Sequence, residues 1–287
     1  MSTRISTSPQ QEANAERALR QWLNEVNAFA ERYARSLFRS KAVLFWTMAF
    51  PAGFYLLTIT ATVPSEALET NEGAIKAGIA VSFGMFGAIM AALNSFCEQL
   101  GTDIEHDRYQ QYRSLSISPS ADLAGRMVSG TLLAILSFLI VIPVAIVTGA
   151  EFTLASYGSP LVVALALIAF AVFWMVVAIL VAVGVKNERY AAIVTVSLAL
   201  IAYMLTGYNG TDPSIYHGPD WLLNVMPHTL ATRLVGVHVV EGTAGLTPPT
   251  APGTATGLAL LALYAIVSLM VGLLVMRRLL YNGGVNG

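Results

Sequence analysis

Charged residues are scarce in this chain of 287 residues. They make up 11% of the sequence, whereas 55% of the residues are hydrophobic; a typical soluble domain has about 25% charged residues. This imbalance excludes an ordinary water-soluble fold and indicates that lipid is the solvent. The net charge is only −1, so nothing in the composition would attract a nucleic acid. The single cysteine, Cys97, excludes an internal disulfide and any metal site built from several cysteines.

Motifs that bind nucleotides or metals are also lacking. The phosphate-binding pattern G-x-x-x-x-G-K-[ST] does not occur, so ATP must bind to a separate polypeptide if it drives this protein. Three histidines and three acidic residues between 209 and 254 could in principle ligate a metal, but their spacings match no H-E-x-x-H or related pattern. No metal, cofactor or catalytic residue is therefore predicted. The three histidines are His217, His228 and His238, and the three acidic residues are Asp212, Asp220 and Glu241.

Long runs without any charged residue are what the chain has instead. A helix that crosses a bilayer needs about 20 apolar residues, and a charge at its centre costs about 2.5–3.5 kcal/mol. Six such runs predict an all-α membrane protein with six transmembrane helices. They are Ala42–Val63, Ala77–Cys97, Met127–Val147, Pro160–Val185, Ala191–Tyr208 and Ala255–Met276.

The distribution of basic residues predicts the orientation. Six spans place both termini on one side, and with the termini in the cytoplasm 14 of the 16 Lys and Arg residues lie inside. Only Lys76 and Arg233 lie outside. Because basic residues favour the cytoplasmic side, we expect cytoplasmic termini and a multi-pass protein of the plasma or inner membrane.

Three segments outside the spans carry a pattern. Apolar residues at helical spacing from Ala15 to Phe38 predict an amphipathic helix, which either lies in the lipid headgroups or docks on a cytoplasmic partner. In the cytoplasmic segment after the second span, Thr102 and Glu105 form a capping-box pattern that predicts a short helix ending at Pro119. This segment is either a protein interface or an ordinary loop, and Ser120 or Asp122 would cap the third span.

The outer region, residues 209–254, is predicted to hold one or two short helices before the last span. Its apolar stretch from Trp221 to Val240 is broken by Pro227 and carries Arg233, so it is too interrupted to span the bilayer. The Pro/Gly/Thr-rich run that follows reads as a linker.

Three stretches carry a resemblance to a known family: RSLFRSKAVLFWTMAFPAGFYLL with Pro51 inside the first span, IEHDRYQQYRSLSISPSADLAGRMVSG, and GPDWLLNVMPHTLATR before the last span. In this order and spacing, from about Arg35 to Arg278, the chain resembles the ABC-2 type transporter permeases, the membrane subunits of type 2 ABC exporters, of the daunorubicin-resistance-permease kind. Two positions depart from the family pattern, because Tyr109 replaces a glycine and Ser118 stands where threonine more often precedes the proline. The matching positions are Glu105, Arg108, Arg113, Leu115, Ser118, Pro119 and Arg126, then Pro219, Trp221, Leu222 and Pro227.

The resemblance implies a domain plan, partners and site residues. Residues 1–41 would form a cytoplasmic tail with a connecting helix, 42–278 the transmembrane domain, and 279–287 a cytoplasmic tail, with a coupling helix from Thr102 to Ile117. Two ATPase subunits carrying ATP and Mg would dock on the connecting and coupling helices. A second permease subunit would complete the pathway, and we expect an identical copy, with a related permease as the alternative. The docking residues it implies are Arg32, Arg35, Arg39, Glu105, Arg108, Tyr109, Tyr112 and Arg113.

Two sets of residues within the spans, and the function itself, have alternative interpretations. Apolar, aromatic and hydroxyl residues within the spans suit either a pathway for a hydrophobic or amphipathic substrate or ordinary packing: Phe50, Tyr55, Thr58, Tyr203 and Thr206. Small residues on one face of the second span suit either a dimer contact or packing within the chain: Ala80, Gly84, Ala88 and Ala92. An ion-coupled secondary transporter, or another polytopic protein without an ATPase partner, is the alternative function, although the six runs hold no charged residue to bind a coupling ion.

Overall fold

The computed structural model describes residues 9–61, 71–185, 187–211, 216–240 and 250–282, and it is helical without any strand in this part of the chain. Five helices are long and apolar enough to cross a membrane. They confirm the all-α, multi-pass architecture. Their bounds are Lys41–Ala61, Glu72–Glu105, Pro119–Val147 (α8), Ser159–Gly184 (α9) and Thr254–Tyr281.

Three of these long helices change their winding along their length. The first comprises α2 (Lys41–Leu44), the π-helical η1 (Phe45–Ala49) and α3 (Phe50–Ala61). The second comprises α5 (Glu72–Ile89), the π-helical η2 (Met90–Ser95) and α6 (Phe96–Glu105). The last joins α13 (Thr254–Val275) to the π-helical η5 (Met276–Tyr281).

The predicted fifth span corresponds to a helix that begins and ends three residues earlier than expected. Its helix is α10 (Glu188–Leu205), and the apolar stretch Arg189–Leu205 falls below the length of the other five. The prediction that helix continues to Tyr208 was wrong. Gly207, Tyr208, Asn209 and Gly210, assigned as α11 (Gly207–Gly210), have φ angles of 66°, 50°, 60° and 81°, so the chain turns left-handed here. Two glycines make such a turn accessible.

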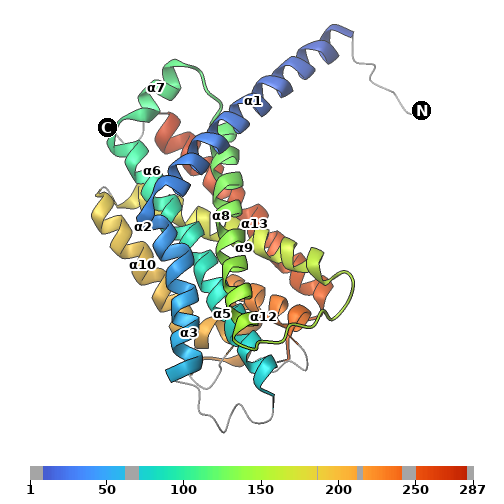
Figure 1. The fold of residues 1–287 in the computed structure, drawn as a ribbon. Coiled ribbons are helices and arrows are strands. Elements are labelled where there is room, and N and C mark those ends of the chain that lie inside the picture. Colours follow the sequence, from blue (N-terminus) through green and yellow to red (C-terminus); the bar gives the residue numbers. More distant parts are fainter. Residues whose placement is uncertain (1–8, 62–70, 186, 212–215, 241–249, 283–287) are drawn as a thin grey trace, which may run out of the picture.

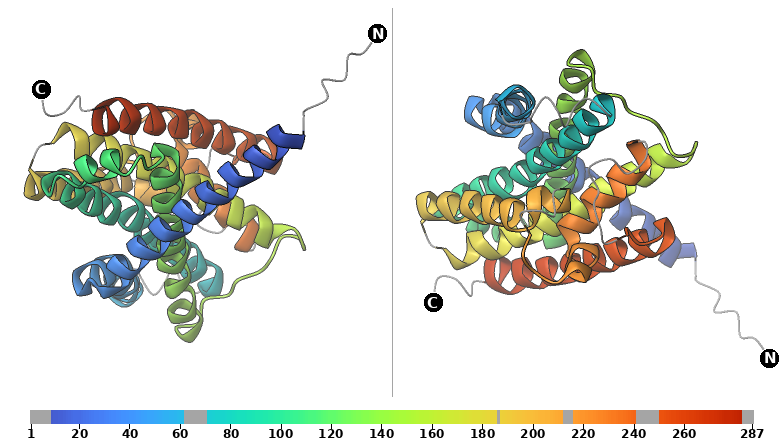
Figure 2. Two further views of the ribbon diagram at one scale, coloured as in Figure 1. Left: turned by 90° about the horizontal axis from the view of Figure 1, so that it is seen from above. Right: turned by 90° about the horizontal axis from the view of Figure 1, so that it is seen from below.

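The helix α5–η2–α6 lies at the centre of the bundle. Figures 1 and 2 show it between the first span and α10, it also contacts α8 and α9, and most of its apolar residues are buried inside the chain. Small residues permit this close packing: a Cβ atom added at Gly84 would lie 2.8 Å from the ring of Phe138 on α8. Ala80, Ala88 and Ala92 are also fully buried. The small-residue face therefore packs within the chain.

A proline explains the π-helical turn in the first span. Pro51 has no N–H group, so it cannot bond to the carbonyl of Thr47 four residues earlier. The Ser137 hydroxyl on α8 donates a hydrogen bond to that carbonyl instead. The wide turn Phe45–Ala49 thus exposes a backbone acceptor that a neighbouring span satisfies.

Two more helices pack against the long ones outside the predicted spans. Helix α1 (Pro9–Arg39) runs obliquely over one end of the bundle and projects beyond it at its N-terminal end (Figure 1). The outer region contains a 3-10 turn, η3 (Asp220–Asn224), and α12 (Pro227–Val239), which is buried against α9, α13 and α5. Pro227 is the first residue of α12, which is why the apolar stretch is broken there. Residues 212–215 and 241–249 of this region, and the predicted end of the first span after Ala61, lie outside the described residues.

Two glycines on neighbouring helices give a matched test of this packing. A Cβ at Gly87 would lie 2.5 Å from the Ser137 hydroxyl and 3.0 Å from Pro51, whereas a Cβ at Gly53 would meet nothing within 4 Å. We expect Gly87→Ala to destabilise the protein by about 1–3 kcal/mol through overpacking, and Gly53→Ala to be neutral or slightly stabilising. Thermal unfolding in detergent measures both. Equal melting temperatures for the two variants would contradict the three-helix contact at Gly87.

Candidate functional site

Charged and tyrosine side chains gather where five elements meet at one end of the bundle. The elements are α1, α6, α8, η5 and a short helix, α7 (Arg108–Ser114), which Figure 1 shows close together. We call this set of residues the charge cluster. Its members are Arg32, Asp103, Arg108, Asp122 and Arg126, with Tyr33, Tyr109, Tyr112 and Tyr281.

Arg126 lies at the centre of the charge cluster and is only 1% exposed. Its Nε donates to Asp122 Oδ1 at 3.0 Å, one helical turn earlier on α8, and its Nη2 pairs with Asp103 Oδ2 on α6. Its guanidinium also stands 4.0 Å from the centre of the Tyr33 ring. Both carboxylates are buried, so each depends on these partners for the stabilisation that water would otherwise give.

Asp103 forms ion pairs with arginines from three separate elements. Besides Arg126 it accepts a bond from Arg32 of α1 at 3.0 Å and pairs with Arg108 of α7. The Tyr33 hydroxyl donates to its Oδ2 at 2.8 Å. One carboxylate therefore joins α1, α6, α7 and α8.

The tyrosines bind the second carboxylate. Tyr33, Tyr109 and Tyr281 donate to Asp122 at 3.2, 3.3 and 3.2 Å, and they come from α1, α7 and η5. Burial, opposed by Arg126 and reinforced by Asp122, raises the pKa of Tyr33 well above its ordinary value. Its hydroxyl therefore stays protonated, and its single proton is shared between Asp103 and Asp122.

A glycine lets α1 approach α8 closely enough for these contacts. A Cβ added at Gly125, between Asp122 and Arg126, would lie 2.5 Å from Phe29 Cβ and 2.8 Å from the carbonyl of Val26. Trp22 of α1 donates to Ser120 at 3.0 Å on the same side. The backbone contact and the charge cluster thus hold the same pair of helices.

The segment after the second span differs from the prediction in its helix boundaries. Thr102 does not cap a helix, because it lies inside α6 and its hydroxyl donates to the Glu98 carbonyl at 2.9 Å. The predicted single coupling helix from Thr102 to Ile117 is instead the end of α6 and the separate α7. The break falls at Asp107, whose φ is 52°.

The start of the third span also lies earlier than predicted. Pro119 begins α8 rather than ending a helix, and Ser118 occupies the position before the first helical residue. Neither Ser120 nor Asp122 caps the helix. Asp122 is buried one turn in, where it pairs with Arg126.

The predicted docking residues divide by exposure. Tyr109 and Tyr112 are buried in the charge cluster, so they hold α7 to the chain; Arg32, Arg108 and Arg113 are half-buried. Arg113 donates to the Leu280 carbonyl at 2.9 Å. The exposed members are Arg35, Arg39 and Glu105.

Sequence reasoning missed most of the centre of the charge cluster. Tyr33, Asp103 and Tyr281 are not among the predicted site residues, Asp122 is predicted only as a possible cap, and Arg126 is named as a site position only in the family pattern. The i, i+4 pair of Asp122 and Arg126 at the entry to a span was the signal available.

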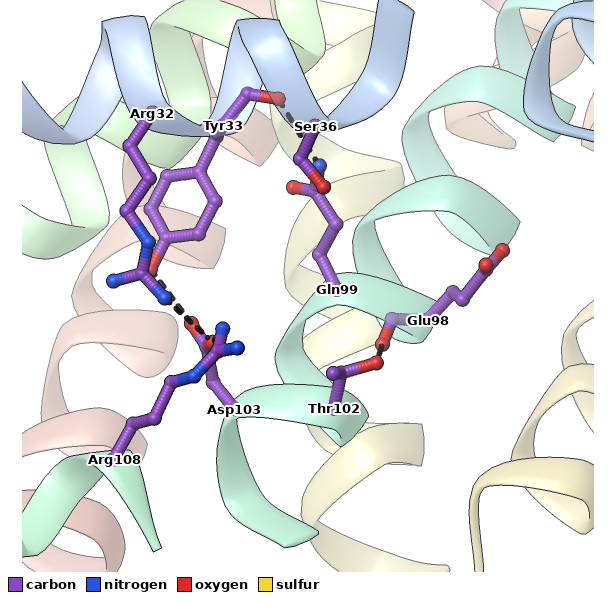
Figure 3. A pocket seen from close by; sticks show the side chains of 8 residues that line it. All are labelled: Arg32, Tyr33, Ser36, Glu98, Gln99, Thr102, Asp103 and Arg108. Atoms are coloured by element: carbon purple, nitrogen blue, oxygen red, sulfur yellow. Dashed lines mark hydrogen bonds and ion pairs between the residues drawn. The ribbon is translucent and has the colours of Figure 1, made fainter. Parts of the chain in front are cut away.

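A small opening lies beside the charge cluster, between α1 and α6 (Figure 3). Its volume is about 140 Å³. Gln99 donates to the Tyr33 carbonyl at 3.2 Å along one wall. The lining residues are Arg32, Tyr33, Ser36, Glu98, Gln99, Thr102, Asp103 and Arg108.

The predicted pathway residues are brought together only in part. The ring centroid of Phe86 lies 6.3 Å from that of Phe50 and 4.6 Å from that of Tyr203. The first, second and fifth predicted spans therefore share an aromatic contact. Tyr55 is fully buried and hydrogen-bonded to Thr148 at 2.8 Å, and Thr206 donates to the Ala202 carbonyl of its own helix at 2.6 Å. Thr58 is half-buried on α3.

The family model that describes the ABC-2 type transporter matches residues 24–238. The chain belongs to this family. The match begins in the second half of α1 and ends in α12, so it includes every member of the charge cluster except Tyr281. A comparison with curated proteins found no match.

Membership in the ABC-2 family establishes the broad role. The chain is the permease of an ABC transporter, a multi-pass membrane component, and permeases of this family generally work with an ATPase partner. The likeness to daunorubicin-resistance permeases stays a prediction.

Removing the central cation tests the charge cluster. We expect Arg126→Gln to destabilise the protein by about 3–5 kcal/mol, because two buried carboxylates lose a shared partner. Arg20→Gln is the control, since Arg20 and Glu16 form an exposed pair at 3.8 Å worth at most about 1 kcal/mol. Thermal unfolding in detergent measures both variants. Similar melting temperatures for Arg126→Gln and Arg20→Gln would contradict a structural role for the buried ions.

Proposed function

We propose that the chain is the membrane subunit of an ATP-driven exporter, which moves a hydrophobic or amphipathic substrate out across the plasma or inner membrane. A separate ATPase, in two copies, would supply the energy from ATP and Mg. A second copy of this permease would complete the pathway. The observation that carries the proposal is the charge cluster, because it joins the expected docking elements to the spans.

The charge cluster gives a mechanical connection between the surface and the membrane. Asp103 of α6 pairs with Arg32 of α1, Arg108 of α7 and Arg126 of α8. These ion pairs connect α1 and α7 to the ends of two long helices, which contain α6 and α8. A partner that pushes on α1 or α7 would move α6 and α8 with them, as rigid elements move in domain closure. The chain lacks a phosphate-binding loop, which is consistent with the energy coming from elsewhere.

Six spans with both termini in the cytoplasm fit this arrangement. The apolar stretch Arg189–Leu205 of α10 is shorter than the other five spans, at about 26 Å for 17 residues. Local thinning of the bilayer accommodates a few Å of mismatch at a cost of fractions of a kcal/mol per Å. Fourteen of the 16 basic residues then lie inside. In that orientation the charge cluster, α1 and α7 all face the cytoplasm, where an ATPase would bind.

The docking surface would centre on the corner between α7 and α8. Leu115 follows α7 and is 70% exposed, which is unusual for a leucine beside charged residues. Arg35, Arg39 and Glu105 are exposed on the neighbouring elements. A protruding apolar side chain with a charged surround has the composition of a binding hot spot and its rim.

Docking at Leu115 can be tested by co-purification. We expect Leu115→Ala to reduce the amount of ATPase that co-purifies with a tagged permease by roughly tenfold or more, the effect of losing a hot-spot side chain. Tyr157→Ala is the control, because Tyr157 is fully exposed but lies in the loop between α8 and α9, at the other end of α8 from α7. If Leu115→Ala retains as much ATPase as Tyr157→Ala, the docking surface is elsewhere.

The energy source needs its own experiment. We expect the permease in liposomes to move substrate only with its ATPase partner and ATP present. Transport by the permease alone, driven by an ion gradient and indifferent to ATP, would establish the secondary-transporter alternative instead.

A further inference from the structure

The charge cluster holds one more cation than it has anions. Arg32, Arg108 and Arg126 contribute three positive charges, and the two carboxylates of Asp103 and Asp122 contribute two negative charges. A third acidic residue, Glu98, also lines the opening, but Figure 3 shows its carboxylate directed away from the guanidinium groups of Arg32 and Arg108. Within the charge cluster, Arg32 and Arg108 therefore share a single carboxylate, that of Asp103.

Two of the three guanidinium groups are accessible from outside the chain. Arg32 and Arg108 are each 37% exposed in their side chains, and they converge on the same oxygen, Asp103 Oδ1. Arg32 donates to Asp103 and Tyr112, and Arg108 donates to Asp103. A guanidinium carries five N–H donors, so both residues keep donors beyond these bonds. Both line the opening of about 140 Å³.

The depth of the opening matches that of lipid headgroups. Glu98, Gln99, Thr102 and Asp103 follow the charge-free run that ends at Cys97. At about 1.5 Å per helical residue they lie roughly 1.5–9 Å beyond the hydrocarbon boundary, and the polar layer of a bilayer extends about 5–8 Å on each side. A lipid headgroup reaches this depth more readily than a side chain of a soluble partner.

We infer that this opening is a binding site for a phosphate group, held between Arg32 and Arg108. Planar guanidinium forks suit phosphate oxygens, and a bound phosphate would balance the excess charge of the cluster. The headgroup of an anionic phospholipid and a free phosphate ion share this chemistry. The lipid fits the depth of the site, an argument that rests on the proposed membrane topology. A lipid bound here would contact both α1 and α7, and so brace the proposed docking corner.

Native mass spectrometry of the detergent-solubilised permease without its ATPase tests the site. Phosphatidylglycerol is the probe, phosphatidylcholine the zwitterionic comparison, and inorganic phosphate the competitor. The variants are Arg32→Gln and Arg108→Gln, with Arg189→Gln as the control, because Arg189 is exposed in the first turn of α10, outside this opening. Ser36→Trp fills the opening without removing a charge, and melting temperatures report the folding of every variant.

We expect one phosphatidylglycerol to bind more tightly than phosphatidylcholine. Arg32→Gln, Arg108→Gln and Ser36→Trp should each weaken that binding roughly tenfold or more, and Arg189→Gln should leave it unchanged. Competition by inorganic phosphate would assign the site to a free phosphate, and its failure to compete would assign the site to the lipid.

Retention of phosphatidylglycerol at wild-type affinity by all three variants would overturn the inference. If Arg32→Gln and Arg108→Gln lower the melting temperature too far to measure binding, Ser36→Trp decides, because it keeps every charge. The ATPase is absent from this experiment, so its result is independent of co-purification and of the proposed function.

Discussion

The burial of one arginine, Arg126, determines how α1, α6, α7, α8 and η5 pack at one end of this permease. The side chain of Arg126 on α8 is buried. It can stay charged only because Asp122, one turn away, and Asp103, on α6, lie against it. Those two carboxylates in turn require Tyr33 from α1, Tyr109 from α7 and Tyr281 from η5. Five elements from three separate parts of the sequence, α1, the consecutive helices α6 to α8, and η5, are therefore held together by these contacts. The close approach of α1 to α8 at Gly125 makes this possible, because a larger residue would separate the partners.

Packing within the membrane extends this connection along the molecule. The central helix α5–η2–α6 carries Asp103 at one end and contacts α3, α8, α9 and α10 along its length through small residues such as Gly84 and Gly87. Without water in the bilayer core, backbone groups that a proline releases must find partners on other helices. The bond from Ser137 to the Thr47 carbonyl, which Pro51 leaves without a helical donor, is one such case. The charge cluster and the spans thus form one continuous packed body, which the proposed coupling to ATP requires.

The sequence predicts the helices better than it predicts the site. Charge-free runs are a strong signal because lipid penalises charges, and α8, α9 and α13 begin or end within one residue of the runs at several boundaries. Local turn chemistry was a poorer guide: Thr102 and Glu105 match a capping box, yet helix α6 continues through them because it extends a packed span. Tyr109 and Tyr112 looked like surface contacts, and their burial depends on α1 and η5, which are distant in sequence. Asp103 could not be recognised for the same reason.

The central claim is that the charge cluster makes α7 move as one body with the half of α8 that carries Asp122 and Arg126. A distance measurement by electron spin resonance tests it most directly, with labels at Gln111→Cys on α7 and Val128→Cys on α8, both exposed positions, in a Cys97→Ser background. In the complex with its ATPase, the account predicts the same narrow distance with and without ATP, and a broad distribution after Asp103→Asn. A distance that shifts with ATP in the otherwise unmodified protein, or that stays narrow after Asp103→Asn, would contradict the account.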